Sequence, residues 1–233
     1  MNFYKHYSFD LWMTLIKSNP SFKTERAQFF FKNFNSKKKT IAEIISIFRQ
    51  VDLMCNAINE KTGKNIDSDE MHLMVISMMN DFDIASFANI DLCWLYNEME
   101  ALLFNYMPVV YSDQTLHSLD KLRQGSSCSF NISSNTAFVR GKALRKVLTS
   151  LSLEPFFDFQ LYSDEIGISK PNRRFFELML EGARGIPSNK NIALMDILHV
   201  GDNPTADIAG ALSAGIHSFQ INSNEATIKN LLN

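Results

Sequence analysis

Four short segments of the 233-residue chain carry residue types suited to ion binding or catalysis. In chain order they hold Asp10, Ser134, Lys170, and the pair of Asp202 and Asp207. Taken alone, each side chain is also typical of a turn, a helix cap or a solvated surface. Together they supply carboxylates, a hydroxyl group and an ammonium group, and clustered carboxylates suit cations that prefer oxygen ligands. A shared site requires that the fold bring the four segments together.

Residues 108–233 alternate short apolar segments with helix-like ones, and another short apolar segment lies near the start of the chain. The segments that predict strands are Tyr7–Leu11, Cys128–Ser133, Phe157–Tyr162, Asp196–Val200 and His217–Ile221. The segments that predict helices are Asp113–Arg123, Lys142–Leu151, Asn172–Ala183 and Thr205–Ala214. This alternation is typical of βαβ units with a parallel sheet. Ligands of such sheets bind at the carboxyl ends of the strands, which is where Asp10, Ser134 and Asp202 are predicted to lie.

The region between these parts reads as helices only. From residue 21 to residue 107 it contains a single glycine, Gly63, and no proline. Thr40 with Glu43 and Asp67 with Glu70 are predicted capping boxes at two helix starts, and Gly63 is a predicted helix end. Four helices without a strand signal predict a small bundle inserted after the first strand. The predicted division is a core of residues 1–16 and 108–233 and a helical domain of residues 17–107.

The composition excludes several classes of protein. The 23 Lys and Arg residues against 25 Asp and Glu residues give a net charge of −2, so no basic surface for nucleic acid is expected. The three cysteines are far apart and lack metal-ligand spacing, which favours reduced thiols. No apolar run is long enough to span a bilayer, and no signal-peptide pattern begins the sequence. We therefore expect a cytoplasmic protein without a membrane partner.

Read together, the four segments resemble the motifs of the haloacid dehalogenase (HAD) superfamily. The resemblance is carried by Phe9-Asp10-Leu11-x-x-Thr14-Leu15 and by Val200-Gly201-Asp202-x-x-x-x-Asp207, with Ser134 and Lys170 between them in the right order. It covers residues 1–15 and 108–233. It implies an α/β fold with a Rossmann-like three-layer core and a parallel sheet, and it explains the four-helix insertion as a mobile cap domain. Most members of the superfamily hydrolyse phosphate esters.

The resemblance also implies a role for each matched residue. Asp10 would attack phosphorus and form an aspartyl-phosphate, Ser134 would donate to the transferring phosphoryl group, and Lys170 would offset the charge repulsion. Mg²⁺ would be held by the carboxylates of Asp10 and Asp202 and the backbone carbonyl of Trp12. Asp207 would orient these ligands or bind the ion through water. Trp12, Thr14 and Asn135 would lie beside the substrate, and Thr14 and Asn203 would support the loops around it.

Trp12 departs from the phosphatase pattern, which has a second aspartate at this position. That aspartate protonates the leaving oxygen and later activates water, and an indole does neither. Loss of a general acid typically costs 10²–10⁴-fold in rate. The sequence thus predicts a Mg²⁺-dependent phosphatase of a small phosphorylated metabolite that is slow rather than inactive.

Two alternatives stay open at this point. In 2-haloacid dehalogenases of the superfamily an aromatic residue occupies the position of Trp12 and no metal is needed. Arg26 and Arg49 are then candidates for the substrate carboxylate, although both are expected on a solvated helix surface. The second alternative is a catalytically impaired phosphate-binding or regulatory protein. The Phe- and Met-rich helices also offer a surface for a homodimer.

Overall fold

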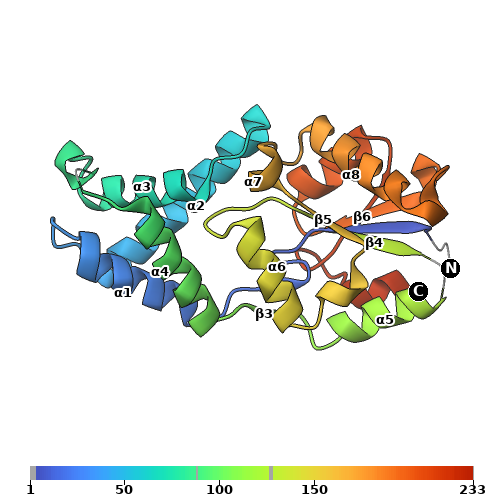
Figure 1. Ribbon diagram of the computed structural model, residues 1–233, viewed down its shortest axis with the longest axis horizontal. Coiled ribbons are helices and arrows are strands. Elements are labelled where there is room, and N and C mark those ends of the chain that lie inside the picture. Colours follow the sequence, from blue (N-terminus) through green and yellow to red (C-terminus); the bar gives the residue numbers. More distant parts are fainter. Residues whose placement is uncertain (1–3, 88, 126–127, 233) are drawn as a thin grey trace.

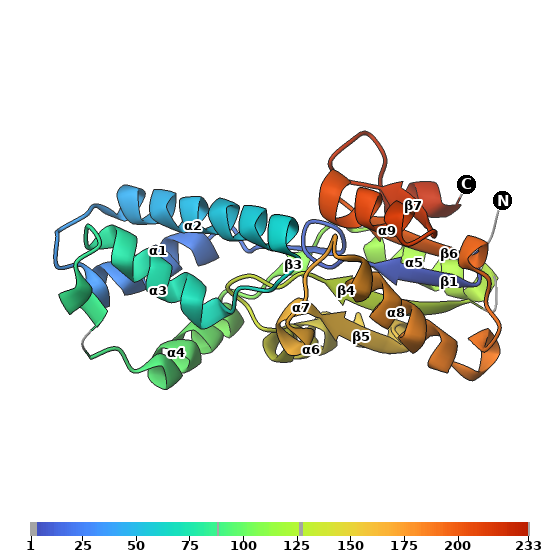
Figure 2. The same ribbon diagram turned by 90° about the horizontal axis from the view of Figure 1, so that it is seen from above.

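The computed structural model describes residues 4–87, 89–125 and 128–232, and Figure 1 shows two parts arranged along one axis. A helical bundle occupies one end, and a sheet flanked by helices occupies the other. Both chain termini lie at the far end of the sheet, away from the bundle (Figures 1 and 2). The chain passes into the bundle directly after the first strand, so the carboxyl ends of the parallel strands face the bundle.

The sheet has five parallel strands in the order β5-β4-β1-β6-β7. They are β1 (His6–Phe9), β4 (Ser129–Ser134), β5 (Phe159–Tyr162), β6 (Ile197–Gly201) and β7 (His217–Gln220). Every residue of the three central strands is buried, as expected of a sheet covered on both faces. Two-residue strands β2 (Ile16–Lys17) and β3 (Val109–Val110) form a separate antiparallel ribbon where the chain enters and leaves the bundle.

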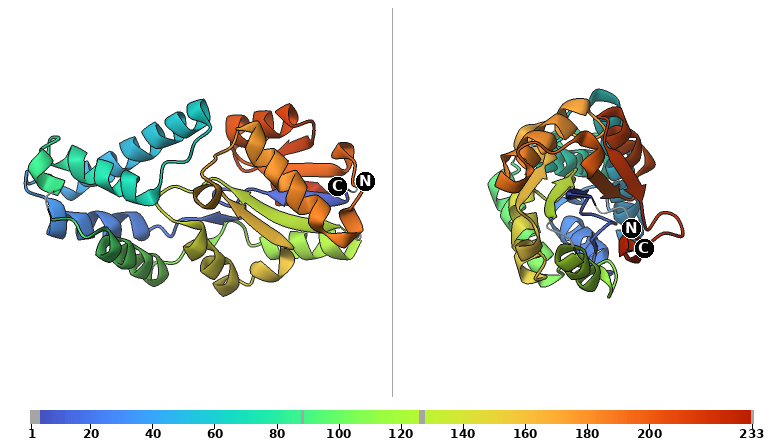
Figure 3. Two further views of the ribbon diagram at one scale, coloured as in Figure 1. Left: turned by 45° about the horizontal axis from the view of Figure 1, so that its top comes forward. Right: turned by 90° about the vertical axis from the view of Figure 1, so that its right-hand side faces the viewer.

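Helices cover both faces of the sheet, which gives three layers. Helices α5 (Thr115–Gly125) and α6 (Gly141–Ser150) lie on one face, and α8 (Arg173–Gly185) and α9 (Gly210–Ser213) lie on the other (Figures 1 and 3). A one-turn helix, α7 (Ser163–Ile166), follows β5. Short 3-10 turns span Ile84–Phe87, Glu154–Phe156, Pro187–Asn189, Leu194–Asp196 and Ile228–Leu232. The predicted α/β, Rossmann-like fold class is confirmed.

The bundle consists of α1 (Phe22–Phe34), α2 (Ile41–Thr62), α3 (Ser68–Met79) and α4 (Leu92–Asn105). Both predicted capping boxes are present, at Thr40 and at Asp67. Gly63 ends α2 in the left-handed conformation with φ of 69°. The four helices enclose their own hydrophobic cluster, centred on side chains such as Phe30, Val51 and Val75. The bundle thus packs around its own core, while the sheet has separate ones.

The structure differs from the sequence prediction after β6. A helix was expected over Thr205–Ala214, but the chain first forms a π-helical turn, Pro204–Ala209, and α9 follows as one turn. The Asn203 side chain accepts from the backbone N–H groups of Thr205 and Ala206, which fixes the start of this turn. Such turns are rare and occur often at functional sites. Among the helices of the described residues, none is both long and apolar enough to cross a membrane.

Candidate active site

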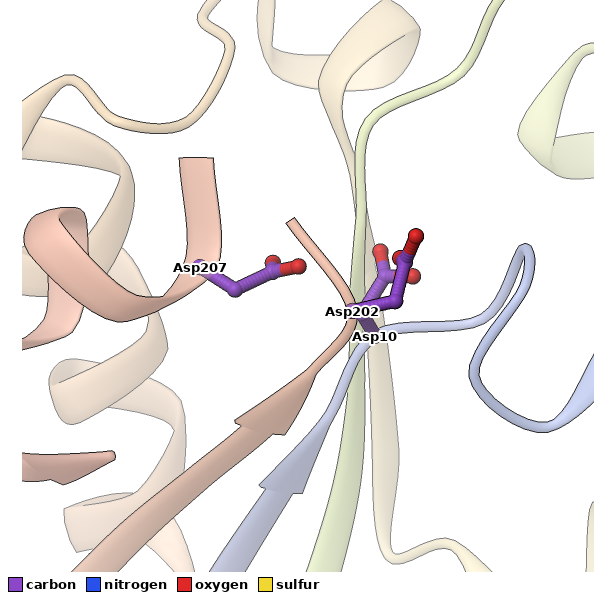
Figure 4. A group of neighbouring side chains, drawn as sticks. All are labelled: Asp10, Asp202 and Asp207. Carbon is purple, nitrogen blue, oxygen red and sulfur yellow. The ribbon is translucent and has the colours of Figure 1, made fainter. Parts of the chain in front are cut away.

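Two carboxylates lie side by side at the carboxyl ends of neighbouring strands. Asp10 follows β1 and Asp202 follows β6, and Figure 4 shows their side chains pointing the same way. The backbone N–H of Asp10 donates to the carbonyl of Val200 at 2.8 Å, so the pairing of the two strands continues to this edge. The hydroxyl of Thr14 lies 3.1 Å from Asp10 Oδ2 and 3.5 Å from Asp202 Oδ1. Thr14 therefore bridges the two acids at the open edge of the sheet.

Lys170 joins this pair from the loop before α8. Its side chain is 1% exposed, and its ammonium group donates to Asp10 Oδ1 at 2.9 Å, Asp207 Oδ1 at 2.5 Å and the Ser133 carbonyl at 2.7 Å. These three bonds use all three ammonium protons. Burial opposes the charge, but Asp10 and Asp207 outweigh it and raise the pKa of Lys170. Lys170 is thus a fixed cation between two carboxylates.

Asp207 approaches from the π-helical turn on the other side of the cluster (Figure 4). Its Oδ1 also accepts from His199 Nε2 at 3.1 Å, and its Oδ2 accepts from the backbone N–H of Asn203 at 3.0 Å. Gly201 permits this approach, because a Cβ there would overlap the Asp207 carboxylate. Burial opposes ionisation, but Lys170 and the hydrogen bond from His199 hold the pKa of Asp207 well below its usual value. Asp207 is a buried anion with both oxygens engaged.

Asp10 and Asp202 show the opposite behaviour. Burial raises the pKa of Asp10 to about 7, with Lys170 opposing the rise and Asp207 and Asp202 adding to it. Burial and the field of Asp207 raise the pKa of Asp202 to about 6. Two neighbouring carboxylates that resist ionisation call for a further positive charge. Lys170 alone does not meet this need, since it also neutralises Asp207.

The donor set at this position fits a hard divalent cation. One oxygen from each of Asp10, Asp202 and Asp207 lies within 4.8 Å of the others. Of these acids, Asp10 and Asp202 point to the open edge, whereas Asp207 is tied to Lys170 and His199. Carboxylate oxygens of this kind suit Mg²⁺, which keeps several waters and takes one or two protein carboxylates. The predicted use of Asp207 as a ligand, directly or through water, stays a prediction.

The turn after β1 supplies the third predicted oxygen donor, the backbone carbonyl of Trp12. Met13 in this turn adopts a φ of 59°, uncommon for a residue other than glycine. Asn222 fixes the turn by donating to the carbonyls of Met13 at 2.9 Å and Thr14 at 3.0 Å. The Trp12 side chain is half-buried and packs against the main hydrophobic cluster of the sheet. At the position where the phosphatase pattern has a second aspartate, this chain therefore has an indole that packs against apolar side chains.

The loop after β4 is fastened to the loop that carries Lys170. The Asn135 amide donates to the Lys170 carbonyl at 2.9 Å and accepts from the Lys170 N–H at 2.8 Å. The buried hydroxyl of Ser134 donates to the carbonyl of Asn135 at 3.2 Å. Asn135 thus positions Lys170, and the predicted contacts of Ser134, Asn135, Thr14 and Trp12 with substrate stay predictions.

The helical bundle also reaches this site. Asn65, after α2, accepts from the hydroxyl of Ser163 at 2.7 Å, and Lys64 forms a β-bridge with Ile168, two residues before Lys170. Glu60 at the end of α2 accepts from the Asn203 amide at 3.2 Å. These contacts join segments that lie 98 or more residues apart in the sequence, so no local sequence pattern indicated them.

His199 is a further residue of the site that the motifs did not include. Its ring bonds to Asp207 from within β6. Because the carboxylate of Asp207 only accepts, Nε2 carries the proton, and Nδ1 accepts from the Ser8 hydroxyl at 3.0 Å. Burial lowers the pKa of His199, so the ring stays neutral. A polar residue in an otherwise apolar strand next to a site was the available signal.

Comparison with known proteins agrees with this geometry. A family model described as HAD-hydrolase-like matches residues 167–232, the segment that carries Lys170, Asp202 and Asp207. Pyrimidine 5'-nucleotidase YjjG of Escherichia coli (strain K12) is 35% identical over 83 residues, which are 35% of this chain and 34% of that protein. The aligned segment therefore spans about a third of the length of this curated relative.

Two solved structures share the whole fold. A HAD-hydrolase from Bacillus subtilis, YfnB, bound to magnesium, aligns with a TM-score of 0.71 at 19% identity and covers 96% of this chain and 91% of its own. A HAD phosphatase from Thermococcus onnurineus aligns with a TM-score of 0.63 at 19% identity and covers 95% and 88%. The fold, the family model over residues 167–232 and the motif residues gathered around Asp10 all support the resemblance to the haloacid dehalogenase superfamily.

Proposed function

We propose that the protein is a Mg²⁺-dependent phosphatase that hydrolyses a small phosphorylated metabolite, with Asp10 as the nucleophile. The observation that carries the proposal is the position of Asp10, held at one oxygen by Lys170 and at the other by Thr14, next to Asp202. A nucleophile fixed at both oxygens beside a cation site meets the positioning demand of phosphoryl transfer. The relative YjjG is named a pyrimidine 5'-nucleotidase, so nucleoside monophosphates belong among the substrates to be tested.

In the proposed reaction Asp10, Lys170 and Ser134 have different roles. Asp10 attacks phosphorus and becomes an aspartyl-phosphate, while the bond from phosphorus to the leaving oxygen breaks on the opposite side and that oxygen takes a proton from water. Lys170 keeps Asp10 oriented and cancels part of the negative charge as the anionic substrate approaches. Ser134 turns its hydroxyl from the Asn135 carbonyl towards a phosphoryl oxygen. Water then hydrolyses the aspartyl-phosphate and releases phosphate.

Asp10, Asp202 and the Trp12 carbonyl would hold Mg²⁺. When bound, this ion supplies the positive charge that two neighbouring carboxylates and a phosphate need. Asp207 keeps Lys170 charged and in place, and His199 keeps Asp207 in place. Outer groups that orient ligands in this way typically change activity 10–100-fold when removed.

The helical bundle would act as the cap over this site. Its contacts through Glu60 and Asn65 reach both the Asn203 turn and the Lys170 loop, so the arrangement corresponds to a closed cap. Closure excludes water from the phosphoryl group, and opening admits the substrate. The antiparallel ribbon of β2 and β3 would serve as the hinge, since both connections between the two parts run through it.

Trp12 supports a second candidate, hydrolysis of 2-haloacids on Asp10 without a metal. Halide leaves without protonation, so an indole in place of the acid costs nothing in that reaction. The pair of Asp10 and Asp202 argues for the phosphatase instead, because a metal-free reaction does not need Asp202 beside Asp10. A phosphate-binding protein without turnover is the third candidate.

One assay decides among the three. The purified protein is given a panel of phosphate monoesters, including pyrimidine nucleoside 5'-monophosphates, and a panel of 2-haloacids, each with Mg²⁺ and with a chelator. We expect phosphate release that the chelator and Asp10→Asn abolish, and that Asp196→Asn, an exposed surface change, leaves intact. Halide release that ignores the chelator would establish the dehalogenase. Phosphate binding without turnover on either panel would establish the binding protein.

A further inference from the structure

The loop after α2 pairs with the core segment that leads into Lys170. Residues 63–65 of this loop, here called the strap, run antiparallel to residues 167–169, and a β-bridge joins the middle residue of each. Backbone N–H groups at the outer positions donate across the pair, one in each direction, at 3.3 Å and 3.2 Å. Figure 1 shows the end of α2 next to α7, the helix that residues 167–169 follow. A segment of the bundle is therefore bonded to the core at the residue before Lys170.

The Asn65 side chain extends this contact to both loops at the site. Its amide oxygen accepts from the Ser163 hydroxyl at 2.7 Å and from the Ser169 hydroxyl at 3.4 Å. The Ser163 oxygen in turn accepts from the backbone N–H of Thr136 at 2.8 Å. Thr136 lies in the loop after β4, and Ser169 lies in the loop before α8. One amide of the bundle thus joins the two core loops that hold the site together.

The hydroxyl groups in this network are closed to solvent. Ser163 and Ser169 are fully buried, and Thr136 is 2% exposed. Gly63 fits closely against the start of α8, because a Cβ on Gly63 would overlap the side chain of Asn172, the N-cap of that helix. A buried hydroxyl or N–H group that loses its acceptor destabilises the structure. The seated strap and the ordered core loops therefore support each other.

Lys170 depends on the position of this backbone. Its buried ammonium group donates to Asp10, Asp207 and the Ser133 carbonyl, so its three bonds require one placement of the side chain. Asn135 holds the Lys170 backbone from the core side, and the strap holds the preceding residue from the bundle side. Misplacing a catalytic group by about 1 Å can cost about 10²-fold in rate. A movement of the strap therefore reaches the reaction through Lys170.

We propose that Asn65 is a positioning residue for Lys170, so that seating of the strap completes the site. When the bundle moves away from the core, the N–H and hydroxyl groups of Ser169 lose the partners that the strap supplies. Lys170 is then held correctly beside Asp10 only in the closed arrangement, in which water is excluded from the phosphoryl group. The kinetic consequence rests on the proposed phosphatase activity, whereas the coupling of the strap to the Lys170 loop does not.

Steady-state kinetics of Asn65→Ala test the effect on the reaction. We expect kcat on the best phosphate ester to fall about tenfold while KM stays nearly unchanged, because orientation is lost and not a binding group. Asn65→Asp keeps an acceptor oxygen for both hydroxyl groups and should retain most of the wild-type kcat. Asn97→Ala removes an exposed amide on α4 and should leave both constants unchanged. A kcat of Asn65→Ala equal to that of the wild type would overturn the proposal, as would a rise in KM alone.

Amide hydrogen exchange of the full-length protein tests the coupling without a substrate. In Asn65→Ala, residues 167–170 should exchange about tenfold faster than in the wild type, the change expected when a buried hydrogen-bonded contact is lost. Ser163→Ala, which removes the hydroxyl between Asn65 and Thr136, should loosen the same segment. Exchange in α5, on the face of the sheet opposite to α8, should not change in either variant. Asn97→Ala should exchange like the wild type throughout.

The two measurements separate this inference from the proposed function. Unchanged exchange at residues 167–170 in folded Asn65→Ala would overturn the inference, whatever the activity of the wild type. A wild type without turnover, in which Asn65→Ala still loosens residues 167–170, would contradict the phosphatase and support the strap as the element that fixes the Lys170 loop.

Discussion

The amide of Asn135 pairs with both backbone groups of Lys170, donating to its carbonyl at 2.9 Å and accepting from its N–H at 2.8 Å. The two residues lie on separate loops, after β4 and before α8. This reciprocal pair fixes the backbone from which the Lys170 side chain extends to Asp10. Asn135 is therefore a positioning residue whose effect passes through Lys170.

Asn135→Ala should lower kcat by roughly 10–100-fold, because Lys170 and Asp10 lose their fixed geometry. KM should change far less, since the variant removes orientation and not a binding group. The readout is steady-state kinetics on the best phosphate ester. Asn33→Ala, which removes an exposed amide on α1, should leave both constants unchanged. A rise in KM without a fall in kcat would instead assign Asn135 to substrate binding.

Lys170→Met should destabilise the metal-free protein by about 3–5 kcal/mol, because two buried carboxylates lose their shared cation. Asp207 suffers most, since it is 1% exposed and Lys170 is the cation to which it bonds. Urea unfolding measures the difference. Lys146→Met, which breaks an exposed pair with Glu100, should cost less than about 1 kcal/mol. Similar losses for the two variants would show that the Lys170 cluster is not strongly coupled.

Signals that span a few residues were predicted accurately from the sequence. The capping boxes at Thr40 and Asp67 and the left-handed end at Gly63 depend on contacts within one helical turn, so the pattern contains the interaction. The placement of Asp10 and Asp202 at strand ends likewise followed from the alternation of strands and helices.

Interactions between distant segments could not be predicted in this way. Lys170 and Asp207 are 37 residues apart, and nothing in either segment indicates that the ammonium group would bind both acids. The ribbon of β2 and β3 has two residues in each strand, too few for a periodic pattern. Arg26 was expected on a solvated helix surface, but its guanidinium lies 4.6 Å from the centre of the Phe138 ring, which comes from the core and not from its own helix.

His6 should make the protein lose stability in mild acid. It is fully buried in β1, where its ring lies 2.7 Å from the Ser129 hydroxyl and 2.9 Å from Asn131 Oδ1. Burial lowers its pKa from 6.5 to about 4, so between these values the unfolded chain binds the proton and the folded chain does not. The contribution is complete above pH 6.5 and is lost as the pH falls towards 4, in total about 3 kcal/mol.

Urea unfolding of the wild type and of His6→Gln between pH 7 and pH 4 measures this effect. The difference in free energy of unfolding between the two proteins should shrink as the pH falls. Taking the difference removes the opposite contributions of Asp10 and Asp202, whose raised pKa values are common to both proteins. A difference that does not vary with pH would mean that His6 is already protonated, or solvated, in the folded state.

Trp12→Asp should raise phosphatase turnover by about 10²-fold or more, because it restores a carboxyl group two residues after the nucleophile. Residues two apart in an extended segment face the same way, so the new side chain points towards the site that Asp10 faces. General acid catalysis is worth 10²–10⁴-fold, and the gain should be greatest for esters with poor leaving groups. Trp12→Asn is the matched control, since it removes the same indole and supplies no acid. If turnover rises equally in both variants, the packing of the indole limits the rate of the wild type. If turnover rises in neither variant while both stay folded, protonation of the leaving oxygen does not limit the rate.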